Sequence, residues 1–247
     1  MKLRIPITVA IAALLISAGY AALFIAPDEA TMHEVQRIFY FHLPAWIAMF
    51  GAFTVGLVAN IAYLRTRNLR WDALGVASVE TGVACCTIGL ITGPLWARPV
   101  WGIWWTWDAR LTSTFVLWLL YISYLLLRGM LEDSGRRATL SAIFGIFASL
   151  DIPLVYLSNR LWRTQHPQPV ILGGQGSGLD PLMGMVLLLC TVAVSCVMVL
   201  GLVDRYQIGI LRMELDELQM EAETRRLHSP ENGSEEIGGA SAMRGSL

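Results

Sequence analysis

Residues 181–203, PLMGMVLLLCTVAVSCVMVLGLV, carry no charged side chain and are long enough to cross a lipid bilayer as one helix. The hydrocarbon core is ~30 Å thick, and a helix needs about 20 apolar residues to span it. The composition agrees, since 55% of the 247 residues are hydrophobic and 15% are charged, which excludes an ordinary soluble domain. The sequence therefore predicts an all-α polytopic membrane bundle of six transmembrane helices. The other five predicted spans are residues 5–26, 43–64, 73–96, 113–128 and 138–158.

Two of these spans need comment. Residues 5–26 are too long and too uniformly apolar for a cleaved signal peptide, so we interpret them as a retained anchor. Residues 113–128 form the shortest span, and we expect it to borrow residues from the stretch before it.

The unequal distribution of Lys and Arg predicts the orientation, because cytoplasmic connections carry the excess of these residues. Most of the 18 Lys and Arg residues lie at the two ends of the chain and in alternate connections, which places both termini in the cytoplasm. The segments predicted to face outward are 27–42, 97–112 and 159–180, and their basic residues are Arg37, Arg98, Arg110, Arg160 and Arg163.

The C-terminal region differs from the six-helix domain, which we place at residues 1–204. Residues 205–228 are expected to form a cytoplasmic helix with a heptad-like apolar stripe, which either docks on a partner or is a solvated, frayed extension. Residues 229–247 are rich in Gly, Ser and Glu and are predicted to be disordered. The stripe consists of Ile208, Leu211, Leu215, Leu218 and Ala222.

Several classes of function are disfavoured by missing motifs. The chain has no P-loop, no GxGxxG and no HExxH, and its net charge of -1 gives no argument for nucleic-acid binding. It also lacks CxxCH, the attachment motif of c-type heme. The cysteines lie in apolar runs and are expected to be inert packing residues. They are Cys85, Cys86, Cys190 and Cys196.

The middle outward segment holds WGIWWTWDARLTS at residues 101–113, which is the densest aromatic cluster in the chain. The spacing of Trp101, Trp104, Trp105 and Asp108 predicts a short helix in the membrane interface with three indoles and a carboxylate on one face. Such a surface suits a large, flat, partly anionic ligand. Asp108 is expected to orient an indole N–H or Arg110 rather than to bind an anion. The remaining candidate of this cluster is Trp107.

The other two outward segments each contain a histidine. RIFYFHLPAW at residues 37–46 contains Arg37 and His42, and NRLWRTQHPQP at residues 159–169 contains His166. Two neutral imidazoles can occupy both axial positions of heme iron, indoles can pack on a porphyrin, and arginine pairs with propionates. The alternative interpretations are an aromatic belt, solvated loop histidines and headgroup anchors.

These segments together resemble the WWD-motif heme-handling proteins of cytochrome c maturation, and among them the CcmC family. The resemblance covers residues 30–203 and also includes TGPLWARPVWG. It implies that His42 and His166 are the axial ligands of heme b, that the tryptophan segment binds one edge of the heme, and that Arg110 meets a propionate. We also assign Arg37 to this site. The long tail after residue 205 is not explained by the family.

The resemblance further implies a function without enzyme activity. The protein would bind heme at the periplasmic face of the bacterial inner membrane and present it to a CcmE-like heme chaperone. The implied partners are CcmA, CcmB and a CcmD-like subunit, with ATP hydrolysis in CcmA. This chain has no ATP-binding motif, which is consistent with that division of roles.

Three alternatives to heme presentation remain. A transmembrane heme transporter would use Glu80 and Asp151 along a path, although we favour a structural role for both carboxylates. A non-heme structural subunit would use the tryptophans as a membrane belt. A heme–apocytochrome ligase is a fourth class, but the chain is too short for it. His33 and His228 are interpreted as solvated.

Overall fold

The computed structural model describes residues 3–162 and 179–228. All regular elements in these ranges are helices, and six helical segments are long and apolar enough to cross a membrane, as the sequence predicts. The helices are α1 Arg4–Tyr20, α2 Phe39–Thr66, α3 Leu69–Trp101, α4 Ala109–Gly129, α5 Ser134–Ser149, α6 Asp151–Leu161 and α7 Pro181–His228, with short π- and 3₁₀-helices at Ala21–Ile25 and Glu34–Ile38.

Several helices begin where the sequence supplies a capping side chain. Asn68 accepts a hydrogen bond from the backbone N–H of Arg70 at 2.9 Å and starts α3, and Asp133 does the same for Arg136 at 2.6 Å and starts α5. The fifth predicted span divides into α5 and α6 at Leu150. Pro153 lacks the N–H that would bond to the carbonyl of Ser149, which explains the interruption.

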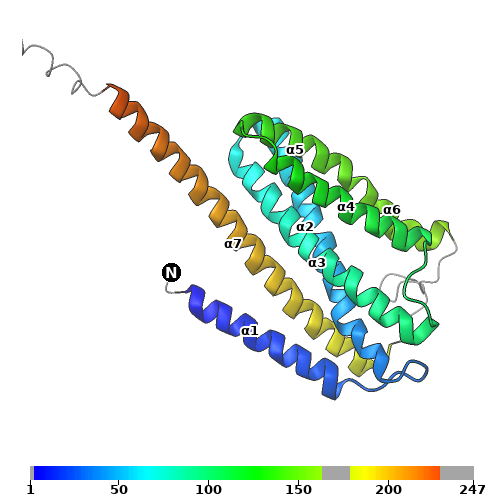
Figure 1. Ribbon diagram of the computed structural model, residues 1–247. Helices are drawn as coiled ribbons and strands as arrows, with labels where there is room; N and C mark the ends of the chain where they lie inside the picture. The colour runs from blue at the N-terminus through cyan, green and yellow to red at the C-terminus, as the bar shows by residue number, and fades with distance from the viewer. Residues whose placement is uncertain (1–2, 163–178, 229–247) are drawn as a thin grey trace, which may run out of the picture. The chain divides into compact units, whose positions relative to one another are not determined.

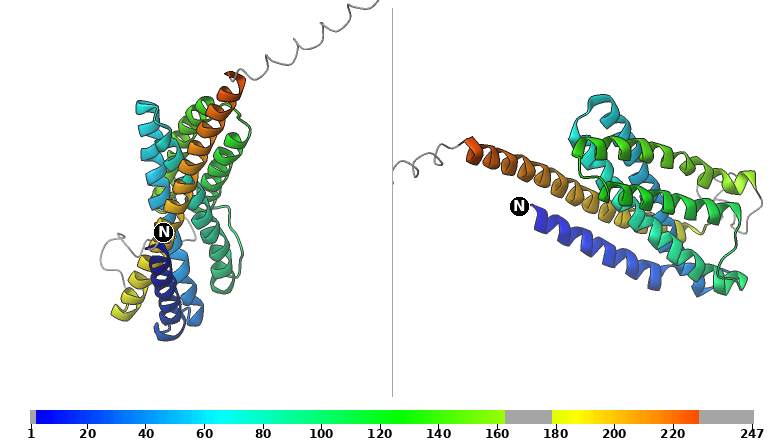
Figure 2. Two further views of the ribbon diagram at one scale, coloured as in Figure 1. Left: turned by 90° about the vertical axis from the view of Figure 1, so that its left-hand side faces the viewer. Right: turned by 45° about the horizontal axis from the view of Figure 1, so that its top comes forward.

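The α2–α3 hairpin forms the centre of the bundle, and α4, α5 and α6 run beside it (Figures 1 and 2). The rings of Phe53 on α2 and Tyr121 on α4 stack with centroids 3.9 Å apart. On α3, a Cβ at Gly82 would overlap the ring of Phe53, so this glycine allows the helices to approach closely. The large apolar side chains of the core are therefore fitted around small residues on α3.

Replacing Gly82 with alanine is expected to lower the thermal stability of the protein in detergent. The new methyl group would push Phe53 off Tyr121, and overpacking of this kind costs about 2 kcal/mol. Gly184→Ala is the matched control, because nothing lies within 4 Å of the added Cβ at that helical position. Equal melting temperatures for the two variants would contradict the close packing of α2 on α3.

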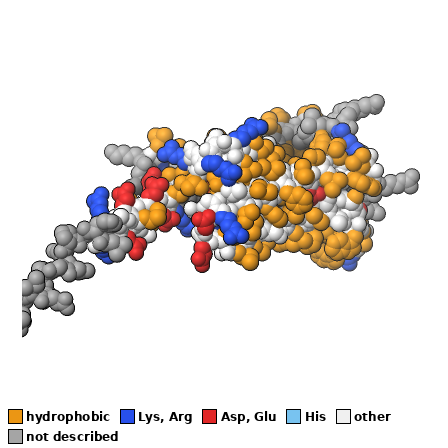
Figure 3. All heavy atoms as spheres, turned by 90° about the horizontal axis from the view of Figure 1, so that it is seen from above, with side chains coloured by type: hydrophobic (Ala, Val, Ile, Leu, Met, Phe, Trp, Pro, Cys, Tyr) orange, Lys and Arg blue, Asp and Glu red, His pale blue; other side chains and the backbone are white. Residues whose placement is uncertain are grey.

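Apolar side chains also cover the outside of the bundle, while charged side chains gather toward one end of the face shown in Figure 3. Of the six spans, Arg4–Ile25 has the smallest buried share, since only 17% of its most apolar window is buried inside the protein. A lipid-facing surface accounts for this exposure, because lipid rather than protein covers it. The four cysteines are free thiols, and three of them are buried.

Two compact units are distinguished along the chain, residues Met1–Gln207 and Ile208–Leu247. Helix α7 is continuous, so residues of the sixth predicted span and residues 205–228 lie on one helix. Within the second unit, the side chains of Leu211 and Leu218 are each 63% exposed. The predicted tail at 229–247 lies outside the described residues.

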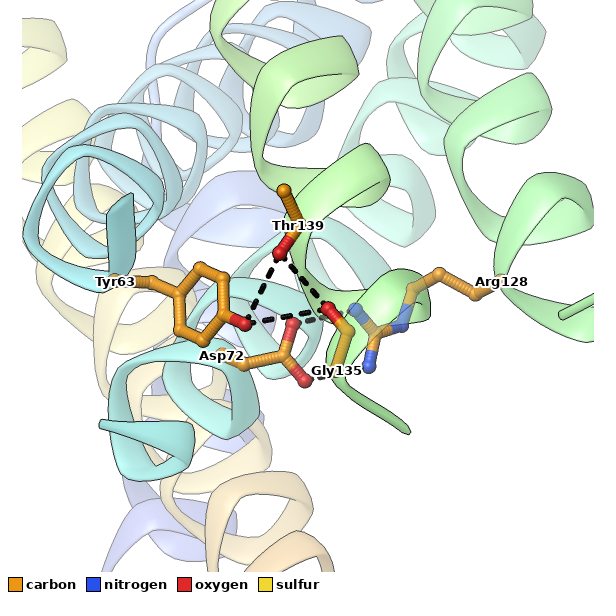
Figure 4. A network of polar contacts seen from close by, with 5 residues as sticks. All are labelled: Tyr63, Asp72, Arg128, Gly135 and Thr139. Carbon is orange, nitrogen blue, oxygen red and sulfur yellow. Dashed lines mark hydrogen bonds and ion pairs between the residues drawn. The ribbon is translucent and has the colours of Figure 1, made fainter. Parts of the chain in front are cut away.

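Polar contacts tie the helices together at the end where α3 begins and α4 finishes. Arg128 donates to both carboxylate oxygens of Asp72, at 2.6 and 2.8 Å (Figure 4). Asp72 lies in the first turn of α3 and Arg128 in the last turn of α4, so each charge also complements its helix dipole. In the same region, the hydroxyl of Tyr63 lies 3.4 Å from the hydroxyl of Thr139.

Candidate functional site

The described candidate residues gather at the opposite end of the bundle. Arg37 and His42 lie where α2 begins, Trp101 ends α3, and Asp108 and Arg110 lie where α4 begins. His166, the second predicted axial ligand, lies outside the described residues, as does Arg163. The connection between α3 and α4 and the start of α2 are therefore the parts of the predicted site whose geometry can be examined.

His42 is buried between α2 and α3, with 7% of its surface exposed. Its Nδ1 lies 2.8 Å from the hydroxyl oxygen of Thr92, and its Nε2 accepts a hydrogen bond from the indole N–H of Trp46 at 2.9 Å. On α3, the ring of Trp96 meets the imidazole edge-on at 5.8 Å. His42 is therefore fixed by hydrogen bonds in the interface between α2 and α3. The sequence predicted that it precedes the helix, whereas it lies in the first turn of α2.

These contacts define the protonation state of His42. An indole can only donate, so Nε2 must carry a lone pair and no proton. The hydroxyl of Thr92 donates to the carbonyl of Ile88 at 2.8 Å, which leaves its oxygen to accept from Nδ1. The imidazole is therefore neutral and protonated at Nδ1. This tautomer presents Nε2 as the metal-binding atom, with the other ring nitrogen held by a hydrogen bond.

The tryptophan segment does not form the predicted interfacial helix. Helix α3 ends at Trp101 because Gly102 adopts a left-handed conformation with φ 76°, and its N–H bonds to the carbonyl of Arg98 at 3.0 Å. Asp108 then starts α4 by accepting from the N–H of Leu111 at 2.9 Å. Residues 102–108 between these two signals are irregular. The stop signal and the start signal override the helical spacing of the tryptophans, so the expectation of three indoles on one helical face was wrong.

Asp108 has a role in α4 that the sequence hypothesis did not include. Besides capping the helix, its carboxylate accepts a hydrogen bond from the hydroxyl of Thr106 at 3.1 Å. It also attracts the guanidinium of Arg110, which is partly buried two residues further on. The fourth span does take Ala109–Thr112 from the tryptophan motif, as expected from its short apolar run.

Two of the tryptophans line an apolar groove between α3 and α4 with a volume of about 380 Å³. Trp105 and Trp107 meet edge-on at 5.7 Å, and Phe115 stacks on Trp118 at 6.1 Å. The indole N–H of Trp105 is buried without a hydrogen-bond partner among the described residues. Trp107 and Trp104 are the most exposed of the cluster, at 74% and 56%. The α3 side of the groove consists of Thr87, Leu90, Ile91 and Pro94.

His42 and this groove lie on opposite faces of α3. Successive residues of a helix are ~100° apart, so Thr92 and Trp96, which contact His42, project about 170° away from the mean direction of the groove residues. The structure therefore brings His42 and the tryptophans to one end of the bundle without placing them in one pocket. That separation is a finding which the linear motifs did not indicate.

Arg37 lies in the short 3₁₀-helix Glu34–Ile38 directly before α2 and forms an ion pair with Asp28 at 3.0 Å. Next to Asp28, the carboxylate of Glu29 accepts hydrogen bonds from the hydroxyl and N–H of Thr31 and from the N–H of Met32. These bonds, led by that from the Thr31 hydroxyl, lower the pKa of Glu29 below its usual value. Arg37 is thus anchored to the loop, with its Nε buried and without a partner in the described part of the chain.

Glu80 and Asp151, the two carboxylates that the sequence places inside the spans, differ in their hydrogen-bond partners. Glu80 on α3 forms a bidentate ion pair with Arg205 of α7, at 2.5 and 2.6 Å, and the neighbouring Asp204 pairs with Arg4 of α1 at 2.6 Å. This pairing supports the structural interpretation of Glu80. Asp151 begins α6, and one of its carboxylate oxygens is buried without a partner among the described residues.

Two residues of the His42 environment were missed by the sequence reasoning. Thr92 and Gly89 have no local signal, because their role depends on how α3 packs against α2. Trp46 belongs to the segment RIFYFHLPAW that the sequence singles out, and it shares the face of His42 because it follows by four residues on a helix.

Comparison with known proteins gives a consistent result. The family model described as Heme exporter protein C matches residues 1–221. The chain is 30% identical over 245 residues to Heme exporter protein C of Bradyrhizobium diazoefficiens, covering 96% of this chain and 93% of the relative. It is 34% identical over 149 residues to Heme exporter protein C of Escherichia coli strain K12, covering 57% and 58% of the two chains. The matched family region contains every described residue of the candidate site.

Proposed function

This chain belongs to the heme exporter protein C family, whose members handle heme for cytochrome c maturation, and on that premise we propose that it binds heme b and presents it to a heme chaperone. It is a multi-pass membrane protein and a heme-delivery component rather than a catalytic enzyme. The observation that carries the proposal is His42, a neutral imidazole fixed in the tautomer whose Nε2 can bind iron.

The donor set fits heme. His42 would supply one axial nitrogen and His166 the other, as in the bis-imidazole sites of electron-transfer hemes. The tryptophan segment would supply flat apolar faces at the same end of the bundle, from Trp101, Trp104, Trp105 and Trp107. Trp105 and Trp107 line the apolar groove, which lies on the other face of α3 from His42. Heme itself supplies the iron and the reactive vinyl groups, and the protein's residues bind and orient it.

The basic residues suit the two propionates of heme. Arg110 is partly buried beside the start of α4, where Asp108 fixes the backbone and attracts the guanidinium. An arginine held in this way keeps its charge and can form paired hydrogen bonds with a carboxylate. Arg37 would serve the second propionate, provided that it exchanges Asp28 for the ligand.

The distribution of basic residues supports an orientation with both termini in the cytoplasm and the heme site facing the periplasm. We place the protein in the bacterial inner membrane, in a multi-subunit Ccm complex. A CcmE-like chaperone would receive the heme, and CcmA, CcmB and a CcmD-like subunit would complete the complex, with ATP hydrolysis in CcmA. The apolar stripe on residues 208–222 suits a helix of such a partner.

The propionate role is tested with Arg110→Ala. We expect this variant to trap about tenfold less heme together with a CcmE-like chaperone in copurification, because one charge-assisted contact worth ~1.5 kcal/mol or more is lost. Arg110→Lys should recover part of the loss. Arg136→Ala at the opposite end of the bundle is the control, since that exposed side chain lies far from the site in the fold. Trapping equal to wild type would exclude Arg110 from the heme site.

A further inference from the structure

The hydrogen bond from Trp46 to His42 has a consequence for heme binding. The two residues are four positions apart on α2, and the indole N–H points at Nε2 with a donor–acceptor distance of 2.9 Å. Nε2 has a single lone pair in the ring plane. It cannot accept the indole hydrogen and bind iron at the same time. Iron binding by His42 therefore requires that the indole leave.

The indole of Trp46 is held in this position by α3. Gly89 faces it, and a Cβ at residue 89 would lie 2.8 Å from Cε2 and 2.9 Å from Cζ2 of the indole. On α2, the ring of Phe50 lies 6.2 Å away, and Trp46 is only 9% exposed. The glycine at position 89 thus provides the space in which the ring sits against His42.

Thr92 contacts the other nitrogen of His42, and this contact is compatible with iron binding. The Nδ1–H donates to the Thr92 hydroxyl at 2.8 Å, which fixes the ring orientation and keeps the proton off Nε2. Partners of this kind raise the basicity of a metal-bound imidazole, and their loss costs roughly 10–100-fold in metal affinity. Thr92 and Trp46 therefore act in opposite directions on the same imidazole.

We propose that Trp46 is a reversible internal competitor for the heme-binding nitrogen of His42, and that Thr92 is the positioning residue which keeps this nitrogen in its ligating tautomer. The inference rests on the proposed role of His42 as an axial ligand. In the heme-free protein the indole satisfies the buried Nε2. When heme binds, the indole is displaced, and its return during transfer favours release of the iron. A protein that delivers heme benefits from such a competitor, because too tight an axial bond would retain the cargo.

The first test replaces Trp46 with phenylalanine, which keeps an aromatic ring and removes the N–H donor. We expect hemin to bind roughly fivefold more tightly, the factor that one net hydrogen bond is worth, and to dissociate more slowly to an excess of apomyoglobin. Trp96→Phe is the matched control. Its ring also meets His42 at 5.8 Å, but its indole N–H does not bond to His42. Binding by Trp46→Phe that is equal to or weaker than that of Trp96→Phe would overturn the proposal.

A second measurement is made on the wild-type chain, and variants serve only to assign the spectral band. The indole N–H band of Trp46, identified by its absence in Trp46→Phe or by its shift in Gly89→Ala, is followed by ultraviolet resonance Raman spectroscopy during hemin titration. We expect a hydrogen-bonded N–H without heme and its loss in step with the appearance of the heme absorption bands. A band that stays unchanged at full heme occupancy would show that the indole is not displaced.

The Thr92 role is tested with Thr92→Val, which keeps the shape and removes the acceptor. We expect hemin to bind at least tenfold more weakly. The heme reduction potential should also become more positive, because the imidazole donates less electron density to the iron. Thr92→Ser should restore both values. An unchanged potential in Thr92→Val would leave Thr92 a packing residue only.

These experiments separate the inference from the proposed function. If the proposed function is wrong, His42→Ala retains the heme spectrum, while the Trp46 N–H band of the heme-free protein still reports its bond to His42. If only the inference is wrong, His42→Ala loses the spectrum and the Trp46 and Thr92 variants behave like their controls.

Discussion

His42→Ala is expected to abolish the bis-imidazole visible spectrum of the heme-bound protein. Of the two proposed axial ligands, His42 is the one that the structure describes, and its hydrogen bonds leave Nε2 unprotonated with a lone pair. Loss of a partner to a metal ligand already costs up to ~100-fold in affinity, so loss of the ligand itself should cost at least that much. The measurement is an absorption spectrum of protein purified from heme-sufficient cells, together with a hemin titration.

Two further variants, one at the second proposed ligand and one at a control position, are compared with His42→Ala. His166→Ala should have the same effect, because a six-coordinate bis-imidazole iron needs both ligands. His33→Asn is the control. His33 lies in the preceding loop and is exposed, outside the α2–α3 interface that holds His42. If both His42→Ala and His166→Ala retain the spectrum, the axial assignment is wrong.

The six spans were predictable from the sequence because the bilayer imposes a length and a composition on each of them. The start of α4 within the tryptophan motif followed from the shortness of the apolar run at residues 113–128. The end of the preceding helix at Gly102 and the capping role of Asp108 also had local signals, but the helical spacing of the tryptophans was given more weight. Stop and start signals determine helix ends more directly than the spacing of side chains does.

The environment of His42 was not predictable in the same way. The contacts of Thr92 and Gly89 with the imidazole and the indole arise from the register of α3 against α2, which no local pattern encodes. The same applies to Glu80, whose partner Arg205 is more than 120 residues away in sequence. For that reason the sequence could name candidate ligands but could not show that His42 and the tryptophan groove lie on opposite faces of α3.

That separation bears on how heme is held. Trp105 and Trp107 at the groove and His42 at the α2–α3 interface cannot contact one porphyrin while each remains where it is, because α3 lies between them. By the same ~100° spacing, Trp101 at the end of α3 projects close to the direction of the groove residues, and Trp104 lies beyond the end of the helix. The geometry therefore favours Trp105 and Trp107 as an apolar surface separate from the His42 side of α3.

The second large effect is expected at the opposite end of the bundle, where Arg128→Ala should destabilise the protein by about 3 kcal/mol. The side chains of Arg128 and Asp72 are only 13% and 12% exposed, and two hydrogen bonds join them. Removing the arginine leaves a carboxylate in a nearly buried position without its cation, which costs more than the pair itself contributes. The loss should appear as a lower melting temperature in detergent with the heme spectrum of the folded fraction unchanged.

A double variant distinguishes a buried charge from a general packing defect. Asp72→Leu combined with Arg128→Met removes both charges and retains apolar volume, so we expect it to recover most of the stability that Arg128→Ala loses. Arg225→Ala is the matched control for losing an arginine from an ion pair. Arg225 lies 3.9 Å from Glu221 with 83% of its side chain exposed, and pairs of that kind contribute little. If Arg128→Ala melts at the same temperature as Arg225→Ala, water reaches Asp72 and the pair is not a structural element of the bundle. If the double variant is no more stable than Arg128→Ala, the cost arises from lost packing around Tyr124, which lies 5.8 Å from the guanidinium.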